Sequence, residues 1–415
     1  MDLLDDATAL ADDLSRLRRE LHHDPEVGLD LPRTQERVLA ELSGLDLEIS
    51  TGARTTSVTA VLRGGRRDAV HPKTVLLRGD MDALPLAERT GLDFASTNGA
   101  MHACGHDLHT TGLVGAARLL HQHRDRLAGD VVLMFQPGEE GWDGAGVMIE
   151  EGVLDASGRR PDAAYAQHVF SGMVPTGVVA TRSGPILSAS HRLGVTVHGV
   201  GGHGSMPHRA KDPIAASAAM ITALQSMVTR RFDIFDPVVV TVGRIYGGTR
   251  HNIIPTESGF EATVRCFSEA SSTKLADAIR ETIEGIATAH GVRATIEFEP
   301  EYPVTVNDTD EASFSADVVR EILGEEHYLE LPQPVGGSED FSRVLNEVPG
   351  AFLMLGATVP GLDPDSAPVN HHPQVDFAAS VLPLASAVHA GLAMTKLEAL
   401  SAHSRTATTT EEYAR

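Results

Sequence analysis

The chain has 415 residues, 42% of them apolar, which is enough for about two domains with sizeable cores. Its formal net charge of -23 argues against nucleic acid and anionic membrane as partners, because both require a basic surface. No stretch reaches the length of a transmembrane helix, and the first residues have neither the basic nor the apolar region of a signal peptide. With two cysteines in the chain, no disulfide framework is expected, and we predict a cytoplasmic protein.

Two kinds of pattern alternate in the first part of the chain. Apolar residues recur at helical spacing in some segments, and short apolar runs rich in valine are typical of strands in others. The helical segments are 12–23, 33–42 and 110–121, and the strand segments are 58–62, 75–77 and 131–135. This alternation predicts an α/β domain whose central sheet is flanked by helices.

From residue 190 the order changes to strand, helix, strand, strand, helix, strand. The segments are 193–200, 214–231, 238–245, 259–267, 273–289 and 293–298. This order is the signature of a ferredoxin-like α+β module. We read the module, 188–301, as inserted into a catalytic domain of 1–187 and 302–400, because the candidate ligands below lie on both sides of it. Residues 401–415, rich in Thr, Ser and Glu, predict a disordered tail.

The most informative run is 101–107, in which Cys104 and His106 flank a single glycine. Thiolate and imidazole are ligands of hydrolytic metal centres. In an extended segment these two side chains leave the backbone on the same side, so we expect them to converge on one ion, with Gly105 letting the chain bend closely around it. For Cys104 alone the alternative is inert core packing, and for a single histidine it is a surface position.

Carboxylates follow two of the predicted strands. Glu139 and Glu140 come after 131–135, where neighbouring side chains of an extended chain diverge. One of them can therefore bind a metal while the other stays free to act as a base. Asp82, after the strand at 75–77, could orient an imidazole ligand, a support that metal-binding histidines commonly have.

Further polar residues could supply the ligands that the Cys104 run and the glutamate pair do not provide. His168, His371 and His372 each lie just beyond an apolar or turn-rich stretch, and open α/β sheets place their sites at strand ends. In the inserted module, His203 follows a glycine pair and Asn252 lies in a loop before a proline, where both could be ordinary turn residues. A single match arises easily by chance, but together the residues predict a metal-dependent hydrolytic site.

The order of these motifs resembles the amidohydrolase branch of the di-metal aminoacylase/carboxypeptidase family, which contains hippurate hydrolases and the plant hydrolases of indole-acetyl-amino acids. The landmarks run through most of the chain: LRRELH at 17–22, RGDMDALP at 78–85, the Cys104 run, FQPGEE at 135–140, GGHGS at 201–205, RHNIIP at 250–255, GSEDF at 337–341 and HHP at 371–373.

The resemblance implies a complete site with two divalent metal ions per subunit. Its metal ligands would be Cys104, His106, Glu140, His168 and His371. Glu139 would be the general base. The family places the last ligand two residues before a proline, where this chain has His371, with His372 beside it as the alternative.

The resemblance also implies roles for the remaining residues and for the inserted module. Asp82 would support an imidazole ligand, His203 would polarise the scissile carbonyl, and Asn252 would help to bind substrate. The module would act as a lid and as the dimerisation domain of a homodimer or dimer-based oligomer. The substrate would be a small N-acyl-amino acid, such as an N-acetyl or N-benzoyl conjugate. A thiolate ligand favours zinc, whereas imidazole and carboxylate also accept manganese, cobalt or nickel.

Other functions stay open at this point. Close to the first is a di-metal dipeptidase or carboxypeptidase, or a deacetylase of the N-acetyl-diaminopimelate type. A different class is a thiol amidase with Cys104 as nucleophile, which should survive metal removal and be inactivated by alkylation. A third is a non-catalytic metal-binding protein, for which a free carboxylate at Glu139 beside a ligand would have no use.

Overall fold

The computed structural model describes residues 3–413, with side chains up to residue 402. The chain divides into two compact units. The first consists of Met1–Gly184, Val306–Gln333 and Arg343–Arg415, and the second of Pro185–Thr305 and Pro334–Ser342. The sequence predicts boundaries near residues 188 and 301, but it gives no sign of the later return of the chain, 334–342, to the second unit.

The first unit is built on a mixed sheet that has eight strands within residues 3–413, in the order β1-β2-β4-β3-β5-β16-β6-β15. Their bounds are β1 Glu48–Thr51, β2 Val58–Leu62, β3 Thr74–Asp80, β4 Asp130–Gln136, β5 Ala163–Phe170, β6 Val179–Thr181, β15 Tyr328–Glu330 and β16 Gly350–Gly356. The central strands β4, β3, β5 and β16 run parallel and are buried along almost their whole length. Such burial requires helices on both faces of the sheet.

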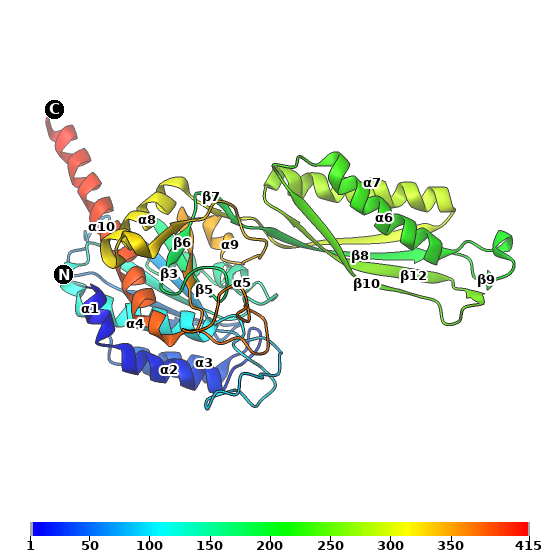
Figure 1. The fold of residues 1–415 in the computed structure, drawn as a ribbon. Coiled ribbons are helices and arrows are strands. Elements are labelled where there is room, and N and C mark those ends of the chain that lie inside the picture. Colours follow the sequence, from blue (N-terminus) through cyan, green and yellow to red (C-terminus); the bar gives the residue numbers. More distant parts are fainter. Residues whose placement is uncertain (1–2, 414–415) are drawn as a thin grey trace. The chain divides into compact units, whose positions relative to one another are not determined.

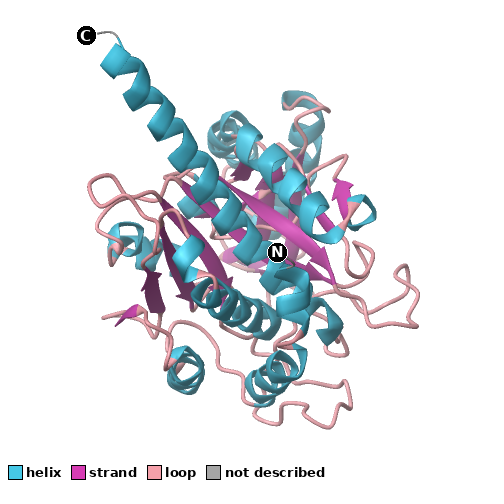
Figure 2. Ribbon diagram, turned by 90° about the vertical axis from the view of Figure 1, so that its left-hand side faces the viewer, coloured by secondary structure: helices cyan, strands magenta, loops and turns pink. Residues whose placement is uncertain are grey.

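Helices cover the two faces of this sheet, as Figures 1 and 2 show. Their bounds are α1 Leu3–Thr8, α2 Ala11–His23, α3 Pro32–Leu42, α4 His106–Gln122, α5 Gly144–Glu150, α8 Thr309–Leu323, α9 Ser342–Leu345 and α10 Leu382–Tyr413. Helix α2 illustrates the pattern: Leu14, Leu17 and Leu21 lie one turn apart along the helix and are all buried. The predicted helices and strands of this unit are thus present, and the predicted α/β class with a helix-flanked sheet is confirmed.

The end of the chain differs from expectation. Helix α10 continues through 401–413, where composition predicts a disordered tail, and residues 414–415 lie outside the described part. A helix that already has a packed first half adds further turns at little cost, because the unfavourable step is its nucleation. Within residues 3–413, no helix is both long and apolar enough to cross a bilayer.

The second unit has the predicted ferredoxin-like order. Its elements are β8 Ala189–His198, α6 Pro213–Arg231, β10 Val238–Gly247, β12 Glu257–Cys266, α7 Glu269–His290 and β13 Arg293–Tyr302, with a short two-stranded antiparallel sheet of β9 Gly202–His203 and β11 Ile253–Ile254. Strands β7 Gly184–Leu187 and β14 Thr305–Asn307 lie at its ends in the sequence. The sheet order is β10-β12-β8-β13, all neighbours antiparallel. Helices α6 and α7 cover one face (Figure 1), and exposure alternates along β13.

Candidate metal centre

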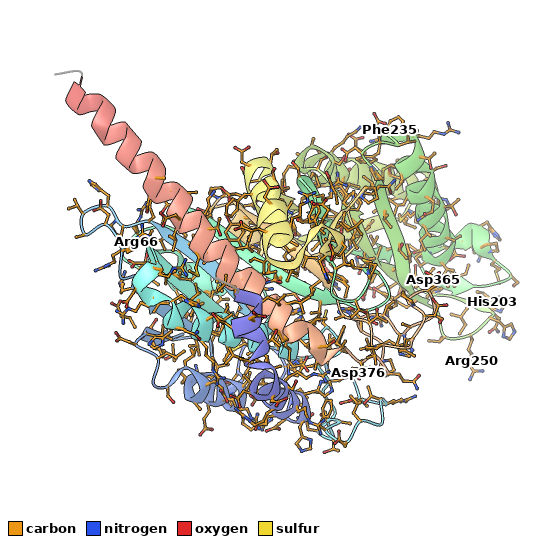
Figure 3. The ribbon with its side chains drawn as sticks, turned by 60° about the vertical axis from the view of Figure 1, so that its left-hand side comes forward. Arg66, His203, Phe235, Arg250, Asp365 and Asp376 are labelled. Carbon is orange, nitrogen blue, oxygen red and sulfur yellow. The ribbon has the colours of Figure 1, made fainter. Side chains whose placement is uncertain are left out.

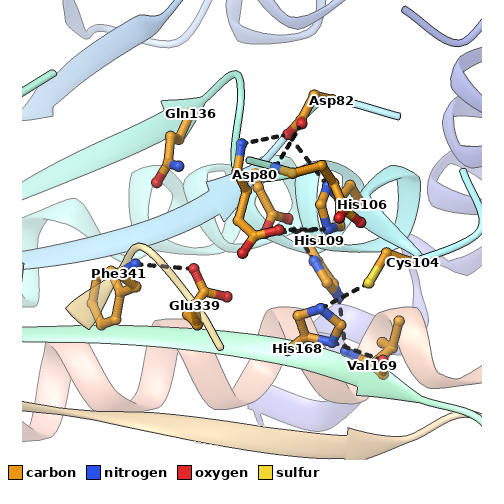
Figure 4. A network of polar contacts seen from close by, with 12 residues as sticks. Asp80, Asp82, Cys104, His106, His109, Gln136, His168, Val169, Glu339 and Phe341 are labelled. Carbon is orange, nitrogen blue, oxygen red and sulfur yellow. Dashed lines mark hydrogen bonds and ion pairs between the residues drawn. The ribbon is translucent and has the colours of Figure 1, made fainter. Parts of the chain in front are cut away.

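Cys104 and His106 are brought together by a sharp turn and not by the extended segment that the sequence predicts. Gly105 has the left-handed φ of 87°, and His106 is already the first residue of α4. A side chain at position 105 has no room, since its Cβ would lie 2.3 Å from Val169 Cγ2. The turn places Cys104 Sγ and ring nitrogens of His106 and His168 within 4.8 Å of one another (Figure 4). Glycine is therefore required here by both backbone conformation and space.

His168 presents a nitrogen lone pair to Cys104. It lies near the end of β5, and its Nδ1 donates to the carbonyl of Val169 at 2.8 Å. A neutral imidazole carries one proton, so Nε2, which lies 3.3 Å from Cys104 Sγ, is the free acceptor. Burial, and then the neighbouring imidazole of His109, hold the pKa of His168 well below its usual value. The neutral ring of His168 could therefore bind a metal ion through Nε2.

The structure brings His371, and not His372, to this group. His371 Nε2 lies 3.2 Å from Cys104 Sγ and 3.1 Å from Glu140 Oε1. Its backbone N–H donates to Ala103 O at 2.8 Å, which fixes the loop beside the Cys104 turn. The ring of His372 is exposed. Its Nδ1 instead accepts the backbone N–H of Gln374, a hydrogen bond within the local turn.

Glu139 and Glu140 do not diverge, contrary to the expectation for an extended chain. A carboxylate oxygen of each lies within 4.8 Å of the other and of His106. The chain turns after β4, and the Asp82 carboxylate accepts the backbone N–H groups of Glu139 at 3.0 Å and of Glu140 at 3.1 Å. Asp82 also faces the imidazole of His106, with 3.4 Å between Oδ1 and Nδ1. One buried carboxylate thus shapes the glutamate turn and supports a candidate ligand.

The sequence does not single out His109, which lies beside the site and interacts with Asp80 at the end of β3. His109 Nε2 accepts the backbone N–H of Val169 at 2.7 Å, so its proton is on Nδ1, which donates to Asp80 Oδ1 at 2.6 Å. Asp80 also accepts from Arg78 at 2.6 Å, and both side chains are fully buried. These contacts use the polar atoms of His109 for support of β3 and β5 beside the site (Figure 4). Its spacing of three from His106 on one helix was the available signal.

The pKa shifts of the candidate ligands show which of their side chains interact with one another. Burial alone would lower the pKa of His106, but Asp80, Asp82 and Cys104 raise it well above its usual value. Hydrogen bonds to Cys104 and Glu140 raise the pKa of His371 to about 10. The surroundings that stabilise a proton on His106 and on His371 would therefore also stabilise a metal cation. Because ligands must be deprotonated, binding of a metal here would release protons.

The donor set fits divalent metal ions. Candidate ligand atoms lie within 4.8 Å of one another in the overlapping groups Cys104/His106/His168, Cys104/Glu140/His371 and His106/Glu139/Glu140. In the described part of the chain, neither ring nitrogen of the buried His106 has a partner in good hydrogen-bond geometry, since the nearest carboxylates are Asp82, 3.4 Å from Nδ1, and Asp80, 3.6 Å from Nε2. Buried polar atoms that are poorly satisfied are costly and favour a ligand. Shared members between groups suit two neighbouring ions better than one.

The second unit places the other two candidates at one short antiparallel pair of strands, β9 and β11. His203 in β9 pairs with Ile253 in β11, and Gly204 N donates to Asn252 O at 2.9 Å. Both side chains are exposed, and Figure 3 shows His203 with Arg250 at one end of this unit. His203 Nδ1 accepts the backbone N–H of Ser205 at 3.2 Å. The neutral ring therefore carries its proton on Nε2, where it can donate to a carbonyl oxygen.

The sequence and the fold of the chain are similar to those of known proteins. The profile described as Peptidase family M20/M25/M40 matches residues 76–395. The chain belongs to this family. The M20/M25/M40 membership confirms the resemblance that the motifs indicate.

Relatives of this M20/M25/M40 chain align over nearly its whole length. IAA-amino acid hydrolase ILR1-like 4 of Arabidopsis thaliana is 37% identical over 391 residues, 93% of this chain and 86% of the plant protein. N-acetylcysteine deacetylase of Bacillus subtilis (strain 168) is 33% identical over 389 residues, 93% of this chain and 97% of that protein. The crystal structure of the Bacillus subtilis YXEP protein, a dinuclear metal binding peptidase from the M20 family, has a TM-score of 0.79 and 31% identity, covering 94% of this chain and 99% of that chain.

Proposed function

We propose that the chain is a metal-dependent amidohydrolase that cleaves the amide bond of N-acyl-amino acids. The observation that carries the proposal is a carboxylate, Glu139, next to a set of ligand atoms drawn from distant parts of the sequence. The proposed ligands of the two ions are Cys104, His106, Glu140, His168 and His371. The plant IAA-amino acid hydrolase and the bacterial N-acetylcysteine deacetylase, both similar over 93% of this chain, support the substrate class.

The proposed chemistry assigns proton transfer to Glu139. Bound divalent ions would lower the pKa of a water molecule and withdraw electrons from the scissile carbonyl. Glu139, only 6% exposed, takes the proton of the attacking water and passes it to the leaving amine nitrogen. Asp82 keeps the carboxylate in place through the turn that it holds. No acyl-enzyme is needed, so Cys104 acts as a ligand and not as a nucleophile.

The second unit is proposed to act as a lid and dimerisation domain. His203 would donate from Nε2 to the oxygen that becomes negative in the tetrahedral transition state, and Asn252, next to the strand that pairs with β9, would bind substrate. The sheet of this unit ends in β10, on which Val239 and Ile245 are exposed. Exposed apolar side chains on an edge strand favour pairing with a second copy of the chain. The cytoplasmic location stays a prediction from composition.

The function is tested by a panel of N-acyl-amino acids, hippurate among them, assayed after chelation and after reloading with zinc, manganese, cobalt or nickel. We expect hydrolysis of at least one member of the panel, its loss with a chelator and its return with one of these metals. Dipeptides in the same panel test the dipeptidase alternative, and N-acetyl-diaminopimelate tests the corresponding deacetylase. Turnover that survives chelation but not thiol alkylation would instead establish the thiol amidase.

The role of Cys104 predicts protection from alkylation by bound metal. Iodoacetamide should label Cys104 only after a chelator has removed the ions, because a thiolate bound to metal is a poor nucleophile. Cys266 is an internal control, since it is buried and its burial raises its pKa to about 11. Peptide mass spectrometry measures both sites at once. Equal labelling of Cys104 with and without metal would remove it from the ligand set.

A further inference from the structure

Arg18 on α2 is buried, with 3% of its side chain exposed, and the proposed mechanism does not use it. Its Nε donates to Asp107 Oδ2 at 2.8 Å, and its Nη2 donates to Asp376 Oδ1 at 3.0 Å. Asp107 directly follows the proposed ligand His106 at the start of α4. Asp376 lies in the segment that follows the proposed ligand His371. One guanidinium therefore joins two ligand-bearing segments that are far apart in the sequence.

The surroundings of Arg18 leave its side chain little freedom. His22, one turn further along α2, donates through Nδ1 to the same Asp107 Oδ2 at 2.8 Å, and its Nε2 lies 3.2 Å from Glu88 Oε1. The ring of Phe94 lies against the guanidinium, 4.9 Å from its centroid to Cζ. Burial alone would lower the pKa of His22, but Asp107 and Glu88 raise it to about 9. Asp107 is thus held between two cations.

The segment that follows His371 is held in place by two hydrogen bonds to Asp376. Asp376 Oδ1 accepts the backbone N–H of Phe377 at 2.8 Å as well as the bond from Arg18. Earlier in the same segment, the N–H of Arg89 donates to Pro373 O at 2.7 Å. A guanidinium is planar and donates in fixed directions, so it sets the separation of the two carboxylates that it joins. A lysine has one ammonium and cannot reproduce this geometry.

We propose that Arg18 is a positioning residue that holds His106 and His371 at the separation that the bound metals require. The inference rests on the ligand assignment of the proposed function. It differs from a purely structural role, because it assigns to Arg18 an effect on metal affinity beyond any effect on folding. Partners that support ligands from outside the coordination sphere typically change metal affinity when they are replaced.

The test compares zinc affinities, measured by competition with a chromophoric chelator, for wild type, Arg18→Met, Arg18→Lys and a control. The control is Arg63→Met, since Arg63 also pairs with a fully buried carboxylate, Asp130, at 2.8 Å. Asp130 is the first residue of β4, whereas Glu139 follows the other end of that strand. We expect both Arg18 variants to bind zinc about 10–100-fold more weakly and Arg63→Met to bind it as wild type does.

Circular dichroism shows which variants are folded. If Arg18→Met does not fold, Asp376→Asn replaces it, because Asp376 is 24% exposed and its loss leaves Asp107 paired with Arg18. A folded set of Arg18 and Asp376 variants with wild-type zinc affinity would overturn the proposal, and so would an equal loss of affinity in Arg63→Met. A wild-type chain that binds no zinc or other divalent metal would overturn the proposed function itself.

Discussion

Replacing Glu139 by glutamine is expected to lower kcat by about 10²–10⁴-fold, because the amide cannot take the proton of the attacking water. Metal content, measured by atomic emission on the purified variant, should stay at the wild-type level. The variant keeps the size and shape of the side chain, and the backbone N–H that Asp82 accepts is unchanged. Loss of turnover without loss of metal separates a base from a ligand.

Glu140→Gln is the matched control, one residue away in the same turn. Glu140 Oε1 lies 3.1 Å from the proposed ligand His371, so the amide should bind the ions more weakly and metal content should fall. The assignment of the two glutamates is wrong if Glu139→Gln keeps near wild-type turnover. It is also wrong if Glu139→Gln loses its metal while Glu140→Gln retains it.

The second large effect is recovery of activity from two inactive chains. If His203 serves the site of the partner subunit, mixing His203→Ala with Glu139→Gln chains gives heterodimers in which one site has both residues intact. Random exchange of subunits then restores about a quarter of wild-type activity, since half of the dimers are mixed and half of their sites are complete. Activity should rise at the rate at which native mass spectrometry shows mixed dimers to form.

A mixture of His203→Ala chains with doubly substituted His203→Ala/Glu139→Gln chains provides the control, because none of its sites can be complete. Recovery there would mean that His203 is dispensable. Mixed dimers that stay inactive in the first experiment would place His203 in the site of its own chain or outside catalysis.

Most of the fold follows from local patterns in the sequence. The amphipathic spacing of α2, from Leu14 to Leu21, and the βαββαβ order of the second unit depend on neighbouring residues, and both are present. The return of 334–342 to the second unit was not foreseen, because it depends on contacts between segments far apart in the chain. The sequence also does not predict helix α10 through 401–413. Composition indicates whether a segment can form a packed core, but it does not indicate whether an existing helix continues into that segment.

The structure brings the candidate ligands together, but in a geometry that the sequence does not indicate. Cys104 and His106 are near each other through a left-handed glycine, a backbone state that the spacing of two residues does not reveal. Glu139 and Glu140 stay together because Asp82, more than fifty residues away, accepts both of their N–H groups. His109 looks like a ligand by type, and only its two hydrogen bonds show that it is a support.

Cys104 and His371 are 267 residues apart in the sequence, yet their side chains lie 3.2 Å from each other. An ion held by both would be a cross-link in the polymer sense, closing a ring of chain that contains the entire second unit. By the chain-entropy argument, a cross-link over so long a loop disfavours the unfolded ensemble by about 5.6 kcal/mol, apart from any bond strength. The ions would then act on the whole molecule as a reversible counterpart of a disulfide, one that forms without an oxidant and opens with a chelator.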